Sequence, residues 1–173
     1  MNGSFLPAEY LADLRTQFEK LKAQADKAVA QVGDEQWQTP LDPESNSLAV
    51  IMRHMAGNLR SRFTDFLITD GEKPDRDRDG EFEPAPLTRQ QILEEWERGW
   101  RVLFASLDTL RPDDLLRRVT IRGEAMPALT ALQRALTHQA SHVGQLVLLA
   151  KHFAGPQWQT LSVPRRPRTP RGQ

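Results

Sequence analysis

Apolar residues recur every three or four positions in four long stretches of this 173-residue chain. This spacing places one hydrophobic stripe along each stretch and is typical of amphipathic helices that share a core. Pro7 suits a first helical turn, whereas Gly33 and Gly71 are typical of helix ends. Thr88 and Gln91 have the spacing of a capping box at the start of the third stretch. The four helices are predicted at residues 7–33, 48–69, 88–110 and 126–153.

The segments between the predicted helices differ in composition. Residues 71–87 form a polar stretch with alternating charges, two Gly and three Pro, which is typical of a solvated connection. This stretch is also long enough to fold over one end of a helical bundle. Residues 119–127 alternate β-branched side chains around Gly123 and could form a small β-hairpin before the last helix. We therefore predict an all-α fold, a four-helix bundle with a long crossover loop.

Three of the four histidines lie one residue before a position of their helix's apolar stripe. His138 and His142 are spaced i,i+4, so they share one helix face about one turn apart. Such a pair can chelate a metal ion through ring nitrogens, although paired helical histidines are also common as hydrogen-bonded polar groups. His54 has the same flanking position on the second predicted helix. If the second and fourth helices are neighbours, all three histidines could converge on one ion.

Three neutral imidazoles with a fourth position open to water are the pattern of a catalytic metal site rather than a closed structural one. Zinc or nickel is the expected divalent ion, with iron or manganese as alternatives. Asn58 lies four residues after His54 on the same flank and is a candidate cofactor-binding or substrate-binding group. Asp65, further along that flank, is a weaker candidate. His152 is left out of the site, because it lies about 15 Å along the helix axis from His142.

The composition and missing motifs exclude several classes of protein. Lys+Arg and Asp+Glu both total 23, so a chain-wide charge that would attract nucleic acid or a membrane is absent. The lack of cysteine excludes disulfides and a thiolate nucleophile and fits a cytoplasmic location. The sequence HQASH lacks the Glu of the zincin protease motif, and no nucleotide-binding glycine motif is present. Neither a secretory signal nor a membrane-spanning stretch is predicted.

The chain length suits a single hydrophobic core, so residues 1–164 are predicted to form one domain. Residues 165–173 form a basic, Pro-rich tail with too few apolar residues to fold alone, and they are predicted to be disordered. Aromatic residues do not interleave the arginines of this tail as base stacking would require. We therefore expect no nucleic-acid partner.

Several segments of the chain resemble the DinB/YfiT-like superfamily, and more narrowly a bacterial subfamily of unassigned function. They are IMRHMAGNLRSRFTDFLITDGEKP, RGEAMP and LTHQASHVGQLVLLAKHF, followed by W-x-x-LSVPR. The resemblance extends from the first predicted helix to about Arg165. It implies a four-helix bundle with a long crossover, a divalent metal ion held by His54, His138 and His142, and a homodimer. Relatives with known activities include transferases and isomerases that use bacillithiol, mycothiol or glutathione, and other members are damage- or stress-induced proteins.

Two functional hypotheses of different classes follow. The first is a divalent-metal-dependent enzyme with a three-histidine site, of the thiol-dependent S-transferase type, in which a low-molecular-weight thiol is a cofactor. Metal-assisted hydrolysis is a variant that needs a general base beside the open position. The second is a non-catalytic metal-binding stress-response protein, or a structural dimeric bundle in which the histidines are hydrogen-bonded polar residues. A small-molecule substrate belongs only to the first hypothesis.

Overall fold

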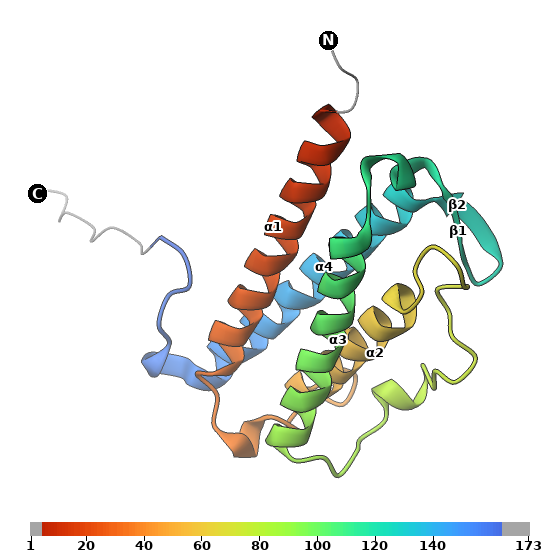
Figure 1. Ribbon diagram of the computed structural model, residues 1–173. Coiled ribbons are helices and arrows are strands. Elements are labelled where there is room, and N and C mark those ends of the chain that lie inside the picture. Colours follow the sequence, from red (N-terminus) through yellow and green to blue (C-terminus); the bar gives the residue numbers. More distant parts are fainter. Residues whose placement is uncertain (1–4, 164–173) are drawn as a thin grey trace, which may run out of the picture.

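The computed structural model describes residues 5–163 and contains the four predicted helices (Figure 1). They form a bundle in which α4 and α3 each pack against both α1 and α2. The predicted all-α fold with a long loop between the second and third helices is thereby confirmed. The predicted tail at residues 165–173 lies outside the described residues. The helices are α1 (Phe5–Val29), α2 (Leu48–Phe63), α3 (Arg89–Thr109) and α4 (Ala128–Ala154).

None of the helices within residues 5–163 has both the length and the apolar character that crossing a lipid bilayer requires. The helices are connected by short elements as well as by loops. A 3-10 helix follows α1, another lies in the crossover loop, a third precedes the hairpin and a fourth follows α4. They are η1 (Asp34–Gln36), η2 (Gly80–Phe82), η3 (Pro112–Leu116) and η4 (Gly155–Gln157).

The predicted end of the second helix at Thr69 was wrong, because α2 ends at Phe63. Thr64 is extended, with φ −65° and ψ 122°, and Asp65 is left-handed, with φ 50°. The apolar period nevertheless continues, since the ring of Phe66 packs 5.3 Å from that of Phe63 without being helical. This continuation misled the sequence-based boundary. The first helix likewise ends before the predicted Gly33.

After α2 ends at Phe63, the chain turns toward the hairpin. The Gly71 amide donates to the Thr120 carbonyl at 2.7 Å. The Asp70 carboxylate accepts hydrogen bonds from the amides of Arg122 and Gly123, both at 2.9 Å. These bonds join the start of the crossover loop to the hairpin turn, which a continued α2 could not provide.

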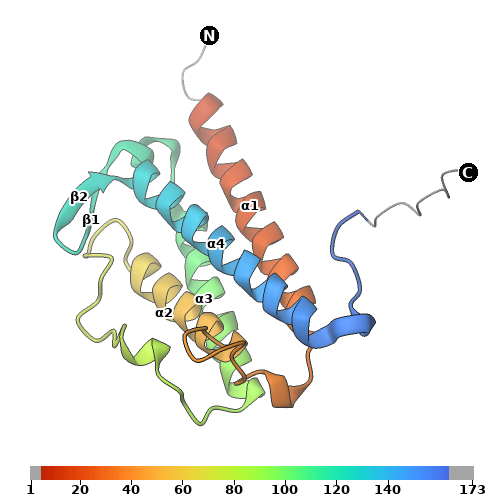
Figure 2. The ribbon, with the colours of Figure 1, turned by 180° about the vertical axis from the view of Figure 1, so that it is seen from behind.

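The small β-hairpin before the last helix is confirmed as β1 (Arg118–Ile121) paired antiparallel with β2 (Glu124–Pro127). Its turn residues Arg122 and Gly123 have φ values of 55° and 77°, as a two-residue turn between twisted strands requires. The side chains of Ile121 and Met126 are buried in the core. The hairpin therefore anchors the start of α4, which follows it directly at Ala128 (Figure 2).

The contact of α2 with α3 is unusually close. A Cβ atom on Gly99 would lie 2.8 Å from the Cα atom of Ala56, so the absence of a side chain at Gly99 allows the two backbones to approach. Ala56 and His54 are two residues apart, which on a helix places them about 200° apart. Close packing of Ala56 on α3 therefore directs His54 to the opposite side of α2, toward α4.

Candidate metal centre

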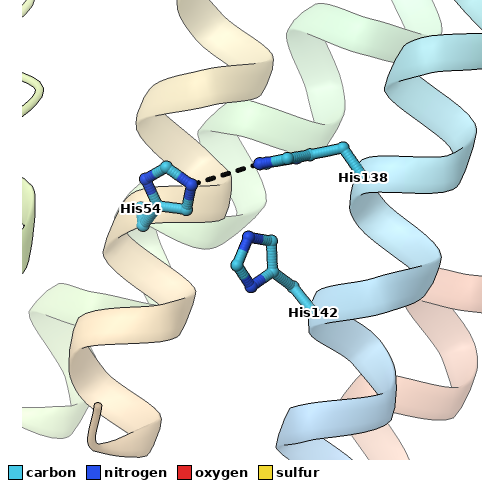
Figure 3. Close-up of side chains that lie close together, drawn as sticks. All are labelled: His54, His138 and His142. Atoms are coloured by element: carbon cyan, nitrogen blue, oxygen red, sulfur yellow. Dashed lines mark hydrogen bonds between the residues drawn. The ribbon is translucent and has the colours of Figure 1, made fainter. Parts of the chain in front are cut away.

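Three histidines from two helices converge between α2 and α4 (Figure 3). His54 comes from α2, whereas His138 and His142 come from adjacent turns of α4. One ring nitrogen of each lies within 4.8 Å of the chosen nitrogens of the other two. The Nε2 atoms of His54 and His138 are 3.2 Å apart. These side chains, which the sequence analysis singled out, could hold one metal ion.

The outer nitrogen of each ring is engaged by a different side chain. His54 Nδ1 lies 3.0 Å from Glu81 Oε2, and because a carboxylate only accepts, His54 donates this bond. His142 Nδ1 donates to Gln145 Oε1 at 2.7 Å. His138 Nδ1 lies 3.4 Å from the amide nitrogen of Gln139. Such partners orient metal-binding imidazoles, because they determine which nitrogen carries the proton.

The proton positions show what an ion would change. The Gln139 amide nitrogen donates to His138 Nδ1, so the His138 proton lies on Nε2 and is donated to His54 Nε2. An ion bound by both Nε2 atoms would move that proton to Nδ1. The carbonyl oxygen of Gln139 is buried and has no hydrogen-bond partner within residues 5–163. Rotation of this amide would offer the acceptor that His138 Nδ1–H needs, so the surrounding residues fit a bound ion.

Glu81 is the main site residue that the sequence analysis missed. It lies in η2 of the crossover loop, and its carboxylate accepts from Arg76 Nε at 2.8 Å as well as from His54. The side chains of Arg76 and Glu81 are only 4% and 12% exposed. Burial raises the pKa of Glu81, but hydrogen bonds from His54 and Arg76 outweigh it and lower that pKa below its usual value. Glu81 is therefore a buried anion beside the first histidine.

The crossover loop covers one side of the candidate centre rather than extending into solvent. The ring of Phe82 lies 4.5 Å from that of His54. Gly57 makes room for this part of the loop, since a Cβ atom there would lie 2.0 Å from Glu81 Oε1. Of the two interpretations of residues 71–87, folding over the bundle is the one the structure supports. A glycine one turn after His54 was the available signal, but nothing in the sequence pairs it with a particular loop carboxylate.

Burial, together with smaller contributions from positive charge on His142 and His54, lowers the pKa of His138 to about 3. The pKa of His142 is also lowered, mainly by burial. Both rings are therefore neutral at neutral pH. Neutral imidazole is the form that binds a metal ion.

The other candidates lie in different places. Asn58 is 8% exposed and lines a cavity of about 110 Å³ together with His138. Asp65 lies beyond the end of α2 and is exposed, so it does not continue the flank of His54. His152 is exposed near the end of α4 and is not among the three convergent histidines, as expected.

The family model described as "Protein of unknown function (DUF1572)" matches residues 6–167. The chain therefore belongs to this family. No curated protein and no solved structure matches the chain. The family match is silent on the wider DinB/YfiT-like resemblance, which stays a prediction.

Proposed function

We propose that this member of the DUF1572 family is a divalent-metal-dependent enzyme, with His54, His138 and His142 as ligands of one ion. The observation that carries the proposal is that the two nitrogens of each ring face different partners. Glu81 and Gln145 accept from the outer nitrogens of His54 and His142, which leaves Nε2 of these two rings for the common centre. Rotation of the Gln139 amide would do the same for His138. Satisfied polar residues alone would not need three imidazoles facing one another.

Two features support catalysis over a purely structural ion. Structural zinc sites are usually closed by four protein ligands, whereas three ligands leave a position for substrate. A cavity of about 110 Å³ adjoins His138 and could admit a small molecule to that position. Zinc and nickel suit imidazole ligands best, with iron(II) and manganese as alternatives.

The reaction class we favour is thiol-dependent S-transfer. A bound divalent ion is a Lewis acid that lowers the pKa of a thiol or water it coordinates. The chain has no cysteine, so a thiol nucleophile would have to be a separate small molecule. Glu81 would hold the His54 ring in the orientation that directs Nε2 at the ion, and Phe82 would shield that ring from water. The choice of a thiol rests on the DinB-like resemblance.

Elemental analysis of the protein purified without a histidine tag tests the metal centre. We expect about one divalent ion per chain in the wild type and loss of that ion in His142→Ala. His152→Ala is the matched control, because it removes an exposed histidine from the same helix, and it should retain the ion. No metal in the wild type, even after reconstitution with zinc, nickel and manganese, would favour the structural bundle instead.

A second measurement separates the enzyme from a non-catalytic metal-binding protein. The wild type loaded with cobalt(II) should change its visible absorption spectrum when bacillithiol, mycothiol or glutathione is added. The change should be absent from cobalt solutions of the His142→Ala protein. Tight metal binding without any spectral response or turnover with these thiols would contradict thiol transfer and favour a stress-response metal-binding protein.

A further inference from the structure

The cavity beside the three histidines is built from the next turn of both helices. Asn58 lies four residues after His54 on α2, and Arg134 lies four residues before His138 on α4. The two helices run in opposite directions (Figures 1 and 2), so these steps lead toward the same end of the bundle. Asn58, Arg134 and His138 accordingly line one cavity. The cavity is therefore continuous with the candidate metal centre.

Asn58 is a polar group that lacks a protein partner. Its residue is 8% exposed, yet none of the side-chain hydrogen bonds found within residues 5–163 involves its amide. The Asn58 amide atoms are not among the fully buried atoms without a partner, so the amide keeps contact with the cavity, where a nearly buried polar group normally finds a partner. Asn58 can both donate to and accept from a molecule in the cavity. This unpartnered side chain indicates a polar ligand.

The two arginines of the cavity differ in how far their charges are balanced. Arg62 is 14% exposed and forms an ion pair with Glu72 at 3.0 Å. Arg134 is 3.5 Å from Glu124, and both side chains are more than half exposed, at 53% and 72%. Exposed ion pairs of this kind contribute little. Arg134 is therefore the cation that a ligand could engage, and it matches a single negative charge.

The remaining wall of the cavity is aliphatic. Ile121 from the hairpin and Ala131 and Ala135 from α4 contribute it. A guanidinium group pairs with a carboxylate through two parallel hydrogen bonds, while an aliphatic wall favours a short carbon chain. A cavity of about 110 Å³ has room for several water molecules or for one such group.

We propose that this cavity binds a short aliphatic monocarboxylate, which is the substrate class of the adjoining centre. The role of this ligand as a substrate rests on the proposed function, whereas its binding in the cavity does not. Arg134 pairs with the carboxylate, Asn58 hydrogen-bonds to it, and the carbon chain extends along the aliphatic wall toward His138. The ligand would thereby reach the three histidines from the side of the hairpin.

Titration with propionate and with its neutral counterpart propionamide tests the proposal. Binding to the full-length chain is followed by amide chemical shifts in NMR, both after metal removal and after loading with zinc. We expect the wild type to bind propionate at least about tenfold more tightly than propionamide, as hydrogen bonds to a charged group allow. Arg134→Gln should abolish this preference in the metal-free protein, and Asn58→Ala should weaken propionate binding.

Arg98→Gln is the matched control, because Arg98 is an exposed arginine of α3 outside the cavity, and it should keep the preference. Equal affinities of the wild type for the two ligands would overturn the proposal, as would an equal loss in the Arg98 variant. The metal-free titration separates this result from the proposed function. If the protein prefers propionate but binds no divalent metal ion, the proposed cavity site is supported and only the proposed metal-dependent enzyme is contradicted.

Discussion

The two sides of α2 differ in chemistry although both are buried. The side toward α3 packs against a buried surface that is apolar apart from glycine, since the buried positions of α3 are Ile92, Trp96, Gly99, Trp100, Leu103 and Leu107. The side toward α4 carries His54 and Asn58, and α4 itself contributes the polar residue Gln139, which is fully buried. Polar groups are costly to bury. Their concentration on one side of one helix coincides with the three histidines that could hold a metal ion.

The apolar side also explains how the polar side keeps its shape. The rings of Trp96 and Trp100 lie 5.4 Å apart at a steep angle, and Gly99 brings the α3 backbone against Ala56. A helix held this closely has little freedom to rotate. His54 is thus positioned by contacts on the opposite face from its own ring, as preorganised metal sites require. The following predictions test this comparison.

Truncation on the apolar side should have the largest effect on stability. Trp100 is fully buried, so Trp100→Ala should lower the free energy of unfolding by about 3–5 kcal/mol. Asn58→Ala, at a nearly buried position of the polar side, should change it by less than about 1 kcal/mol, because no protein hydrogen bond is lost. Urea unfolding of the metal-free protein measures both. Equal losses in the free energy of unfolding would mean that the two sides of α2 contribute equally to stability, which would contradict the comparison.

The close helix contact should be sensitive to a single methyl group. Gly99→Ala should lower the free energy of unfolding, because about 1–3 kcal/mol of overpacking against Ala56 exceeds the gain in helix propensity of about 1 kcal/mol. In Gly144→Ala, on the exposed side of α4, the new Cβ atom meets no described atom within 4 Å. That control should therefore be stabilised. Thermal unfolding of both variants checks the opposite signs, and stabilisation by Gly99→Ala would contradict the close contact.

On the polar side, a change outside the three histidines should weaken the metal centre. Glu81→Gln should reduce zinc affinity by at least about tenfold, or about 1.4 kcal/mol, because the group that orients His54 loses its charge. Gly57→Ala should act in the same direction by displacing the Glu81 carboxylate. Competition with a chelating dye measures the affinities. Glu83→Gln, an exposed acid of the same loop, is the control and should leave zinc affinity unchanged.

The smallest expected effect is the pH dependence of the metal-free protein. The pKa of His138 is about 3 in the folded chain and about 6.5 when unfolded, so the unfolded state binds the proton more readily. Stability is therefore fully present above pH 6.5 and is lost as the pH falls toward 3. Between pH 7 and 5.5 the loss should be on the order of 1 kcal/mol, allowing for the solvent-exposed part of the ring.

His138→Leu should make stability less dependent on pH over this range. Urea unfolding at a series of pH values measures the difference between this variant and the wild type. A wild-type protein whose stability is constant between pH 7 and 5.5 would show that His138 is not desolvated in the folded state. His152→Ala should retain the wild-type profile, because that ring is exposed.

Much of the fold followed from patterns within single segments. The Thr88–Gln91 capping box is present, with the Gln91 side chain accepting from the Thr88 amide at 2.9 Å. The hairpin around Gly123 also has the predicted position. The end of α2 was misplaced, because the apolar period passes through Phe66 while the backbone turns at Asp65. Periodicity reports which side chains are buried and does not report whether the backbone between them is helical.

By itself, the sequence determined the helices and the positions of the three histidines beside their apolar stripes, because a helix converts spacing directly into direction. Only the tertiary structure decided that α2 and α4 are neighbours and that Glu81 reaches His54 across 27 positions. It also decided that Arg134 and Asn58 share a cavity with His138. Such pairings depend on how whole elements pack and where a loop returns, and no local periodicity encodes either.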